Sequence, residues 1–300
     1  MKTIFQQLLI LYVFLFLGWL IGKCKKKQAG HVDILSVLLV NILLPCKIFK
    51  TFSGQFTVSY FLEKYPYLLA SLALLAVLLV VAHFVSRLLG RTAYERRVYS
   101  YSCIITNYGY LGYALIEAVF GEVMLAAFMF FAVPFVTYTY TAGYVLLTGG
   151  DKPMKKLCNP ITAAIVLGAI FGLVGLPLPA VADSVLSMGS ACVGPLCMLL
   201  TGITLSTFAL KELLTEKTAY IFCALRLVVI PAAAYGVCRL LHLDFVLPMV
   251  LIITAMPCGL NAIVFPKLIG ENCKPGARLA LLTHVFSLIT LPFWLSLIQI

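Results

Sequence analysis

The sequence predicts an all-α polytopic membrane protein with ten transmembrane helices, arranged as two inverted five-helix repeats. Three features predict this fold: the composition, the length of the apolar segments, and irregularities at matching places in the two halves. Of the 300 residues, 62% are hydrophobic and 11% are charged. Because soluble domains average about 45–50% apolar and about 25% charged residues, this chain lacks the polar side chains needed to cover a soluble surface.

The apolar segments have the length that a bilayer requires, since about 20 apolar residues cross its hydrocarbon core. The first segment ends in the basic stretch 23–27 and lacks a small-residue cleavage site, so we interpret it as a membrane helix and not as a signal peptide. Short breaks rich in Lys, Arg, Gly or Pro separate the segments that follow, without a soluble domain or a long linker. In chain order, the expected helices cover residues 4–22, 32–52, 66–89, 98–118, 122–148, 159–178, 182–207, 218–240, 244–269 and 276–298.

The basic residues predict the orientation. Most Lys and Arg residues lie in the loops that follow the odd-numbered segments, whereas the other side carries only Lys2, Lys50, Lys64 and Arg239. Cytoplasmic loops of membrane proteins are enriched in Lys and Arg. We therefore expect a plasma-membrane protein with odd-numbered loops in the cytoplasm and both termini outside. This placement also explains the net charge of +11 without a nucleic-acid partner.

Ten segments divide into five plus five, which we expect as repeats over residues 1–150 and 151–300. An odd number of helices in each half gives the halves opposite orientations, as in many secondary transporters. Matched irregularities support this division. They are Asn41 to Pro45 in segment 2 with Gly194-Pro195 in segment 7, and Asn107, Gly109 and Gly112 in segment 4 with Pro257, Gly259 and Asn261 in segment 9.

These irregularities predict two broken helices that cross near the membrane midplane. Proline removes a backbone hydrogen bond and glycine weakens a helix, and in lipid the freed groups must be satisfied inside the protein. The N-termini of half-helices carry partial positive charge and suit a carboxylate. The Asn side chains add neutral donors and acceptors. For segments 2 and 7, a simple packing kink is the favoured explanation of the proline.

The same stretches resemble the auxin efflux carrier family in its bacterial branch. The similarity rests on Asn41-Ile-Leu-Leu-Pro45, on Asn107-Tyr-Gly-Tyr-Leu-Gly112, and on Met256-Pro257-Cys-Gly-Leu-Asn261, in this order over the whole chain. The resemblance implies an inverted-repeat carrier with crossed helices 4 and 9 that moves organic anions of the malate or malonate type. Ala114 stands where the family often has proline, so helix 4 would break through its glycines alone.

Charges inside the expected spans complete the candidate site. Arg226 lies within segment 8, where it could balance a bound carboxylate or hold the scaffold. Lys47, near the outer end of segment 2, is expected to reach the membrane surface, and Glu117 is expected at the interface. His284 is expected to be a packing residue. Tyr108 and Tyr110 could line a pocket.

We therefore expect a secondary transporter of a small organic anion that works by alternating access. The substrate-binding candidates are Asn107, Gly109, Gly112, Pro257, Gly259, Asn261, Asn41 and Arg226. An ion-coupled symporter of another solute, a channel, or a sensor with a transporter-like fold are the alternatives. The spans contain no HExxH, no GxSxG and no phosphate-binding loop, so no enzyme is expected. The ten Cys show no metal-ligand spacing, and neither a metal nor a cofactor is expected. Expected partners are the bilayer, a coupling proton or sodium ion, and a second copy in a homodimer.

Overall fold

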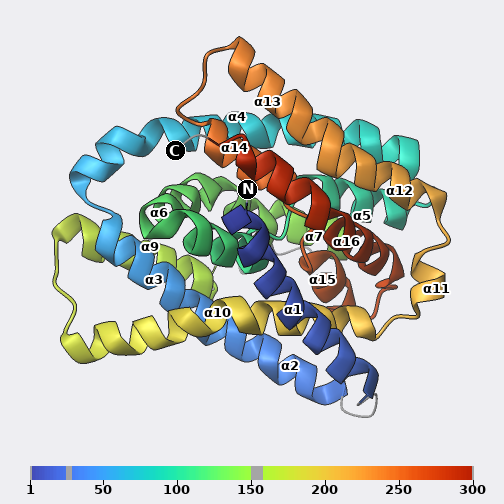
Figure 1. Cartoon of the computed structure of the whole chain (residues 1–300), viewed down its shortest axis with the longest axis horizontal. Coiled ribbons are helices and arrows are strands. Elements are labelled where there is room, and N and C mark those ends of the chain that lie inside the picture. Colours follow the sequence, from blue (N-terminus) through green and yellow to red (C-terminus); the bar gives the residue numbers. More distant parts are fainter. Residues whose placement is uncertain (1, 25–28, 150–157, 299–300) are drawn as a thin grey trace.

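The protein is a bundle of helices in a computed structural model that describes residues 2–24, 29–149 and 158–298 (Figure 1). Three short segments are π-helical and carry the label η. The elements are α1 (Lys2–Cys24), α2 (Ala29–Leu38), η2 (Leu39–Leu43), α3 (Leu44–Gln55), α4 (Val58–Leu89), α5 (Ala93–Ile104), η3 (Tyr108–Gly112), α6 (Tyr113–Tyr140), α7 (Ala142–Thr148), α9 (Pro160–Val174), α10 (Ala180–Ser206), α11 (Leu210–Leu213), α12 (Lys217–Ala224), η4 (Leu225–Val229), α13 (Ile230–Leu240), α14 (Leu247–Ala255), α15 (Asn261–Leu268) and α16 (Lys274–Ser296).

The structure confirms an all-helical polytopic membrane protein. Over the described ranges, seven helical stretches are long and apolar enough to cross a membrane. This number differs from the ten that the sequence predicts because four of the expected segments take other forms. The second part of segment 4 joins segment 5 in one continuous stretch, Tyr108–Thr148, in which Gly121 turns the chain with φ 82°. The first part of segment 4 lies in α5. Segment 6 is the shorter helix α9, and segment 9 is divided between α14 and α15.

The prolines of segments 2 and 7 do not interrupt their helices, in agreement with the packing-kink interpretation. Helix α10 continues without interruption from Ala180 to Ser206, although it contains Pro195. In segment 2, Pro45 follows a π-helical turn, and the helix continues into α3. A proline removes one hydrogen bond, and a local widening of the helix can absorb this loss without ending it.

A second π-helical turn, η4, precedes Pro231 in segment 8. Pro231 has no N–H to donate to the carbonyl of Leu227, four residues earlier. The indole Nε1 of Trp294 donates to that carbonyl over 2.8 Å. The side chain from α16 thus satisfies the backbone group that the proline leaves free, as a membrane interior requires.

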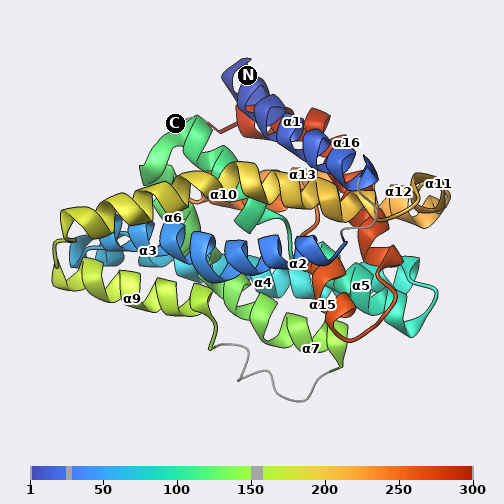
Figure 2. The ribbon, with the colours of Figure 1, turned by 90° about the horizontal axis from the view of Figure 1, so that it is seen from below.

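Helices α10, α3 and α9 lie one above another, with α1 on the outer side of α10 (Figure 2). Small residues allow these helices to approach closely. A Cβ at Gly202 of α10 would lie 1.9 Å from the carbonyl oxygen of Leu15, and one at Gly18 of α1 would lie 2.1 Å from that of Leu199. The backbones of α1 and α10 are therefore in direct contact, and we call α1, α2, α3, α9 and α10 the first helix group.

The remaining helices, α4 to α7 and α11 to α16, form the second helix group. Helix α4 packs along α5 and α6, and α16 packs against α12, α14 and α1 (Figure 1). The contacts between the two groups run through α3, α10 and α1 on one side and η3, α6 and α16 on the other. The candidate site lies along this boundary.

Ion pairs join several loops at one end of the bundle. Glu216 lies 2.9 Å from Arg91 and 3.6 Å from Arg278, and Glu212 lies 2.5 Å from Lys274. The bond to Lys274 lowers the pKa of the exposed Glu212 carboxyl. The loops after expected segments 3, 7 and 9 thus share one face, as the charge pattern requires. That this face is cytoplasmic stays a prediction.

Candidate functional site

The helix interruptions of segments 4 and 9 meet in space. Residues 105–107, between α5 and η3, pair with residues 257–259, between α14 and α15. The backbone N–H of Asn107 donates to the carbonyl of Pro257 over 2.7 Å, and that of Gly259 donates to the carbonyl of Ile105 over 3.2 Å. Thr106 and Cys258 form an antiparallel bridge. The two interruptions therefore satisfy part of each other's backbone inside the protein, which lipid could not do.

The sequence explains the interruption in segment 9. Residues that precede proline avoid the helical conformation, and Met256 before Pro257 is extended, with φ −65° and ψ 147°. Gly259 permits the close approach of the other strand, because a Cβ there would lie 3.0 Å from the carbonyl oxygen of Thr106. In segment 4 no proline is present, and the helix ends at Ile104, before Gly109 and Gly112. Those two glycines lie in the π-helical turn η3, beyond the interruption itself.

Two helices begin at these interruptions, so their N-termini lie there. Segment η3, which continues into α6, starts at Tyr108, and α15 starts at Asn261. In η3, the N–H groups of Leu111 and Gly112 donate to the carbonyl of Asn107. The N–H groups before the first intrahelical bond of a helix lack an intrahelical partner and carry partial positive charge. Both helix starts thus offer donors to an anion.

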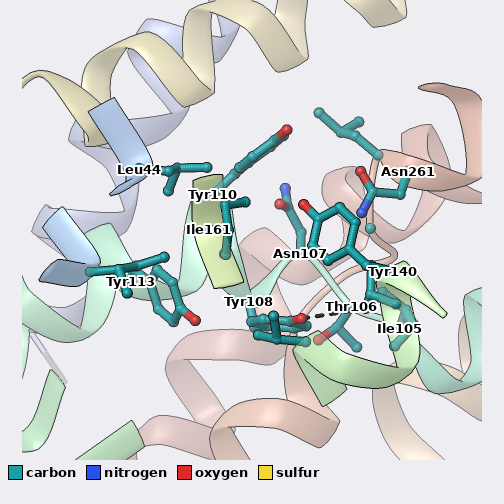
Figure 3. Close-up of a pocket in the computed structure, with 16 residues that line it drawn as sticks. Leu44, Ile105, Thr106, Asn107, Tyr108, Tyr110, Tyr113, Tyr140, Ile161 and Asn261 are labelled. Atoms are coloured by element: carbon teal, nitrogen blue, oxygen red, sulfur yellow. Dashed lines mark hydrogen bonds between the residues drawn. The ribbon is translucent and has the colours of Figure 1, made fainter. Parts of the chain in front are cut away.

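A cavity of about 50 Å³ lies between the interruptions, at the boundary of the two helix groups (Figure 3). We call it the site cavity. In Figure 3 the Tyr140 ring lies between the amides of Asn107 and Asn261. Hydroxyl and amide groups supply the polar part of its wall, and aliphatic side chains from α3 and α9 close the other side. The lining residues are Leu44, Ile48, Ile105, Thr106, Asn107, Tyr108, Gly109, Tyr110, Tyr113, Val136, Thr139, Tyr140, Ile161, Gly259, Leu260 and Asn261.

The structure gathers six of the eight sequence candidates at this place. Asn107, Gly109, Gly259 and Asn261 line the site cavity. Pro257 bonds to Asn107 through its carbonyl, and the Gly112 N–H bonds to the carbonyl of Asn107. Their contact with substrate stays a prediction, but the six residues share the position that such a role requires.

The other two candidates lie apart from the site cavity. Asn41 is exposed, and its amide donates to the carbonyl of Val37 in the preceding turn. Arg226 is fully buried and donates to the carbonyls of Ile253 and Thr254. These carbonyls belong to the last turn of α14, where a helix leaves acceptors unpaired and carries partial negative charge. Arg226 thus caps the C-terminal end of α14, the first half of the broken helix. A direct contact between Arg226 and the substrate stays a prediction.

His284 of α16 holds Asn107 in place. Its Nε2 lies 2.9 Å from the amide nitrogen of Asn107, and its Nδ1 lies 2.7 Å from the carbonyl oxygen of Ala280. Because the carbonyl can only accept, Nδ1 carries the proton and Nε2 accepts from the amide. The amide oxygen of Asn107 takes no part in the hydrogen bond to His284. The sequence expectation of a packing residue misses this contact, since nothing in the pattern around His284 connects it with Asn107.

The environment of Lys47 differs from the sequence expectation. Lys47 is 1% exposed, so it does not reach the membrane surface. It forms an ion pair with Glu117, whose side chain is 37% exposed. A buried ammonium group needs a counter-charge, and the carboxylate from α6 supplies it. Each residue lies near the end of an expected span, where a charged side chain can reach water. Neither position in the sequence therefore indicates an ion pair.

Tyrosines line the site cavity more densely than expected. Tyr108 and Tyr110 lie there as predicted, and Tyr113 and Tyr140 join them. The hydroxyl of Tyr108 lies 3.4 Å from that of Thr139. Tyr140 is the last residue of α6. The run of Tyr in segments 4 and 5 is a signal that could have placed these residues at the site.

Comparison with known proteins decides the family. The model of the family described as "Membrane transport protein" matches residues 3–156 and 149–295. The chain belongs to this family, the auxin efflux carrier family. An uncharacterized transporter of Methanocaldococcus jannaschii is 28% identical over 282 residues, which cover 88% of this chain and 89% of the relative. An uncharacterized transporter of Methanothermobacter thermautotrophicus is 24% identical, and the uncharacterized transporter YfdV of Escherichia coli is 20% identical, each with 96% of both chains covered.

Membership of the auxin efflux carrier family makes the chain a membrane transporter and not an enzyme. The resemblance found in the helix-breaking motifs is thereby confirmed. Among the residues that the structure describes, no group of three or more His, Cys, Asp or Glu could hold a metal ion.

Proposed function

We propose that this transporter moves a small organic anion, a mono- or dicarboxylate of the malate or malonate type, by alternating access. The observation that carries the proposal is the meeting of two helix N-termini at one cavity. Tyr108 and Asn261 begin these helices, and the amides of Asn107 and Asn261 line the cavity. Helix N-termini favour negative charge, and neutral amides and hydroxyls can donate to carboxylate oxygens.

The proposed architecture has ten transmembrane helices in two inverted repeats, with the interrupted helices 4 and 9 crossing at the site cavity. Gly121 divides segments 4 and 5, and α14 with α15 forms helix 9. The paired backbones at Thr106 and Cys258 support the crossing. The two family matches overlap at residues 149–156, close to the proposed boundary at residue 150, which supports the division into halves.

Alternating access would move the second helix group against the first. The site cavity lies at their boundary, with Leu44, Ile48 and Ile161 from the first group and the remaining lining residues from the second. Ligand sites have volumes of about 300–1,000 Å³, whereas this cavity has about 50 Å³. Substrate entry therefore requires the two groups to separate. The proposed orientation places both termini outside the plasma membrane, and a homodimer is the proposed assembly.

The test is a substrate screen with the purified full-length protein in proteoliposomes. Uptake of radiolabelled carboxylates is measured under imposed pH, sodium and voltage gradients. The proposal predicts saturable uptake of a mono- or dicarboxylate and counterflow when unlabelled substrate is loaded inside. Counterflow separates a carrier from a channel. A preference for organic cations, or uptake that never saturates, contradicts the proposal.

A further inference from the structure

The ion pair of Lys47 and Glu117 lies close to both the site cavity and a second cavity. On α3, Leu44 and Ile48, on either side of Lys47 in the sequence, line the site cavity, and Lys50 lines the second. On α6, Tyr113 lines the site cavity, and Glu117, about one helical turn or 5.4 Å further on, lines the second. Glu117 thus belongs to the wall of the second cavity, and Lys47, its partner, lies next to residues that line the site cavity.

The second cavity has a volume of about 400 Å³, and most of the residues that line it are polar or charged. This volume falls within the range of about 300–1,000 Å³ for small-molecule sites. Lys50 bonds to the hydroxyl of Ser187 and lies 3.7 Å from Asp183. All its lining residues lie on the face proposed to be outside. They are Lys50, Thr51, Ser53, Gly54, Gln55, Glu117, Glu122, Leu178, Asp183, Ser187, Ser190 and Ala191.

The ion pair also joins the two helix groups. Lys47 belongs to the first group and Glu117 to the second, so a movement of one group against the other separates them. Lys47 is 1% exposed, and a buried ammonium group left without a counter-charge is strongly unfavourable. Any such movement therefore requires a replacement for the carboxylate of Glu117. The proposed substrate carries the same chemical group.

We propose that a carboxylate of the substrate replaces Glu117 as the partner of Lys47, and that Glu117 takes up a proton from the second cavity as it leaves. Lys47 is then a substrate-binding residue, and Glu117 carries the coupling proton. The charges balance. Before the exchange, the ammonium and the Glu117 carboxylate sum to zero. After it, protonated Glu117 is neutral, and the ammonium pairs with the substrate carboxylate. This inference rests on the proposed function, because it takes the substrate to be a carboxylate.

Other titratable groups face the same cavity and must be separated in the test. Glu122 follows Gly121 in α6, Asp183 comes from α10, and Lys50 comes from α3. Lys50 is held by Asp183 and Ser187, whereas Glu117 is the carboxylate that contacts Lys47. His284 contacts Asn107, which lines the site cavity, and is a further titratable group near the pair. A pH dependence of substrate affinity does not by itself identify Glu117 as the titrating group. The test is whether Glu117→Gln removes that pH dependence.

The experiment measures malonate affinity by isothermal titration calorimetry over a pH series, with the purified full-length transporter. Wild-type affinity is expected to rise as the pH falls, since protonation of Glu117 releases Lys47. Glu117→Gln mimics the protonated state, so its affinity should be high and independent of pH. Lys47→Gln should bind about 10- to 150-fold more weakly, the equivalent of one charge-assisted hydrogen bond. The double variant should behave like Lys47→Gln.

Glu63→Gln is the matched control, because Glu63 pairs with Lys64 and is 69% exposed on α4. It should keep the wild-type affinity and pH profile. Glu117→Gln decides the matter even if Lys47→Gln fails to fold. The inference is overturned if Glu117→Gln binds malonate with unchanged or lower affinity. It is also overturned if the pH dependence of affinity persists in Glu117→Gln and disappears in Glu122→Gln. If the wild-type protein binds no carboxylate, the proposed function falls as well, whereas binding without an effect of Glu117→Gln removes this inference alone.

Discussion

Replacement of Arg226 by Met tests how the broken helix 9 is stabilised. The guanidinium donates to the carbonyls of Ile253 and Thr254, at the end of α14, and is fully buried. Met has similar length but no donor, so both carbonyls lose their partner. An unsatisfied buried acceptor costs about 1–3 kcal/mol, which gives about 2–6 kcal/mol for the two. At about 2 °C per kcal/mol for a chain of this size, the melting temperature should fall by about 4–12 °C.

The assay measures the melting temperature of the detergent-purified variants without ligand, together with carboxylate affinity in the same preparations. Arg226→Lys should lose less stability, because an ammonium group can still donate to one of the carbonyls. Arg239→Met is the control, since Arg239 lies at the protein surface, in an exposed ion pair with Asp244 worth about 0–1 kcal/mol. Wild-type stability of Arg226→Met with a loss of affinity would refute the capping role and assign Arg226 to substrate binding.

Three further substitutions test the packing and the crossing through the melting temperature. Gly202→Ala should lower the melting temperature by the equivalent of about 1–3 kcal/mol or more, because the new Cβ would lie 1.9 Å from the Leu15 carbonyl oxygen. Gly236→Ala is the control: Gly236 has open space around it, so its melting temperature should stay unchanged or rise. Gly259→Ala should lower both the melting temperature and carboxylate affinity, because it presses against the Thr106 carbonyl at 3.0 Å. Trp294→Phe should cost about 1–3 kcal/mol, because the buried Leu227 carbonyl loses its partner, and an unchanged melting temperature would contradict that contact.

The sequence predicts the helical membrane fold and the region of the site because both depend on local chemistry. Apolar length defines most of the spans, and Pro257 with Gly259 marks the interruption of segment 9. Proline is nevertheless an ambiguous signal. Pro195 stays inside a continuous helix, and Pro231 is accommodated because Trp294, distant in the sequence, bonds to the carbonyl that the proline leaves free.

The contacts that define the site depend on tertiary structure and escape a prediction from the sequence. Lys47 and Glu117 are 70 residues apart, and Asn107 and His284 are 177 residues apart. No local pattern connects such pairs. Arg226 is recognisable from the sequence as an unusual buried charge, but its partners are backbone carbonyls of α14, which carry no sequence signal.

The most direct test of a carboxylate site at the crossing is the affinity of Asn261→Ala. Asn261 lines the site cavity at the start of α15, whereas Asn272, an exposed loop residue that accepts from the Lys274 N–H, provides the same substitution away from it. Carboxylate affinity and melting temperature are measured in the same preparations. The account predicts that Asn261→Ala binds about 10- to 150-fold more weakly with little change in melting temperature, and that Asn272→Ala keeps wild-type affinity. Wild-type affinity in a folded Asn261→Ala protein would contradict the account.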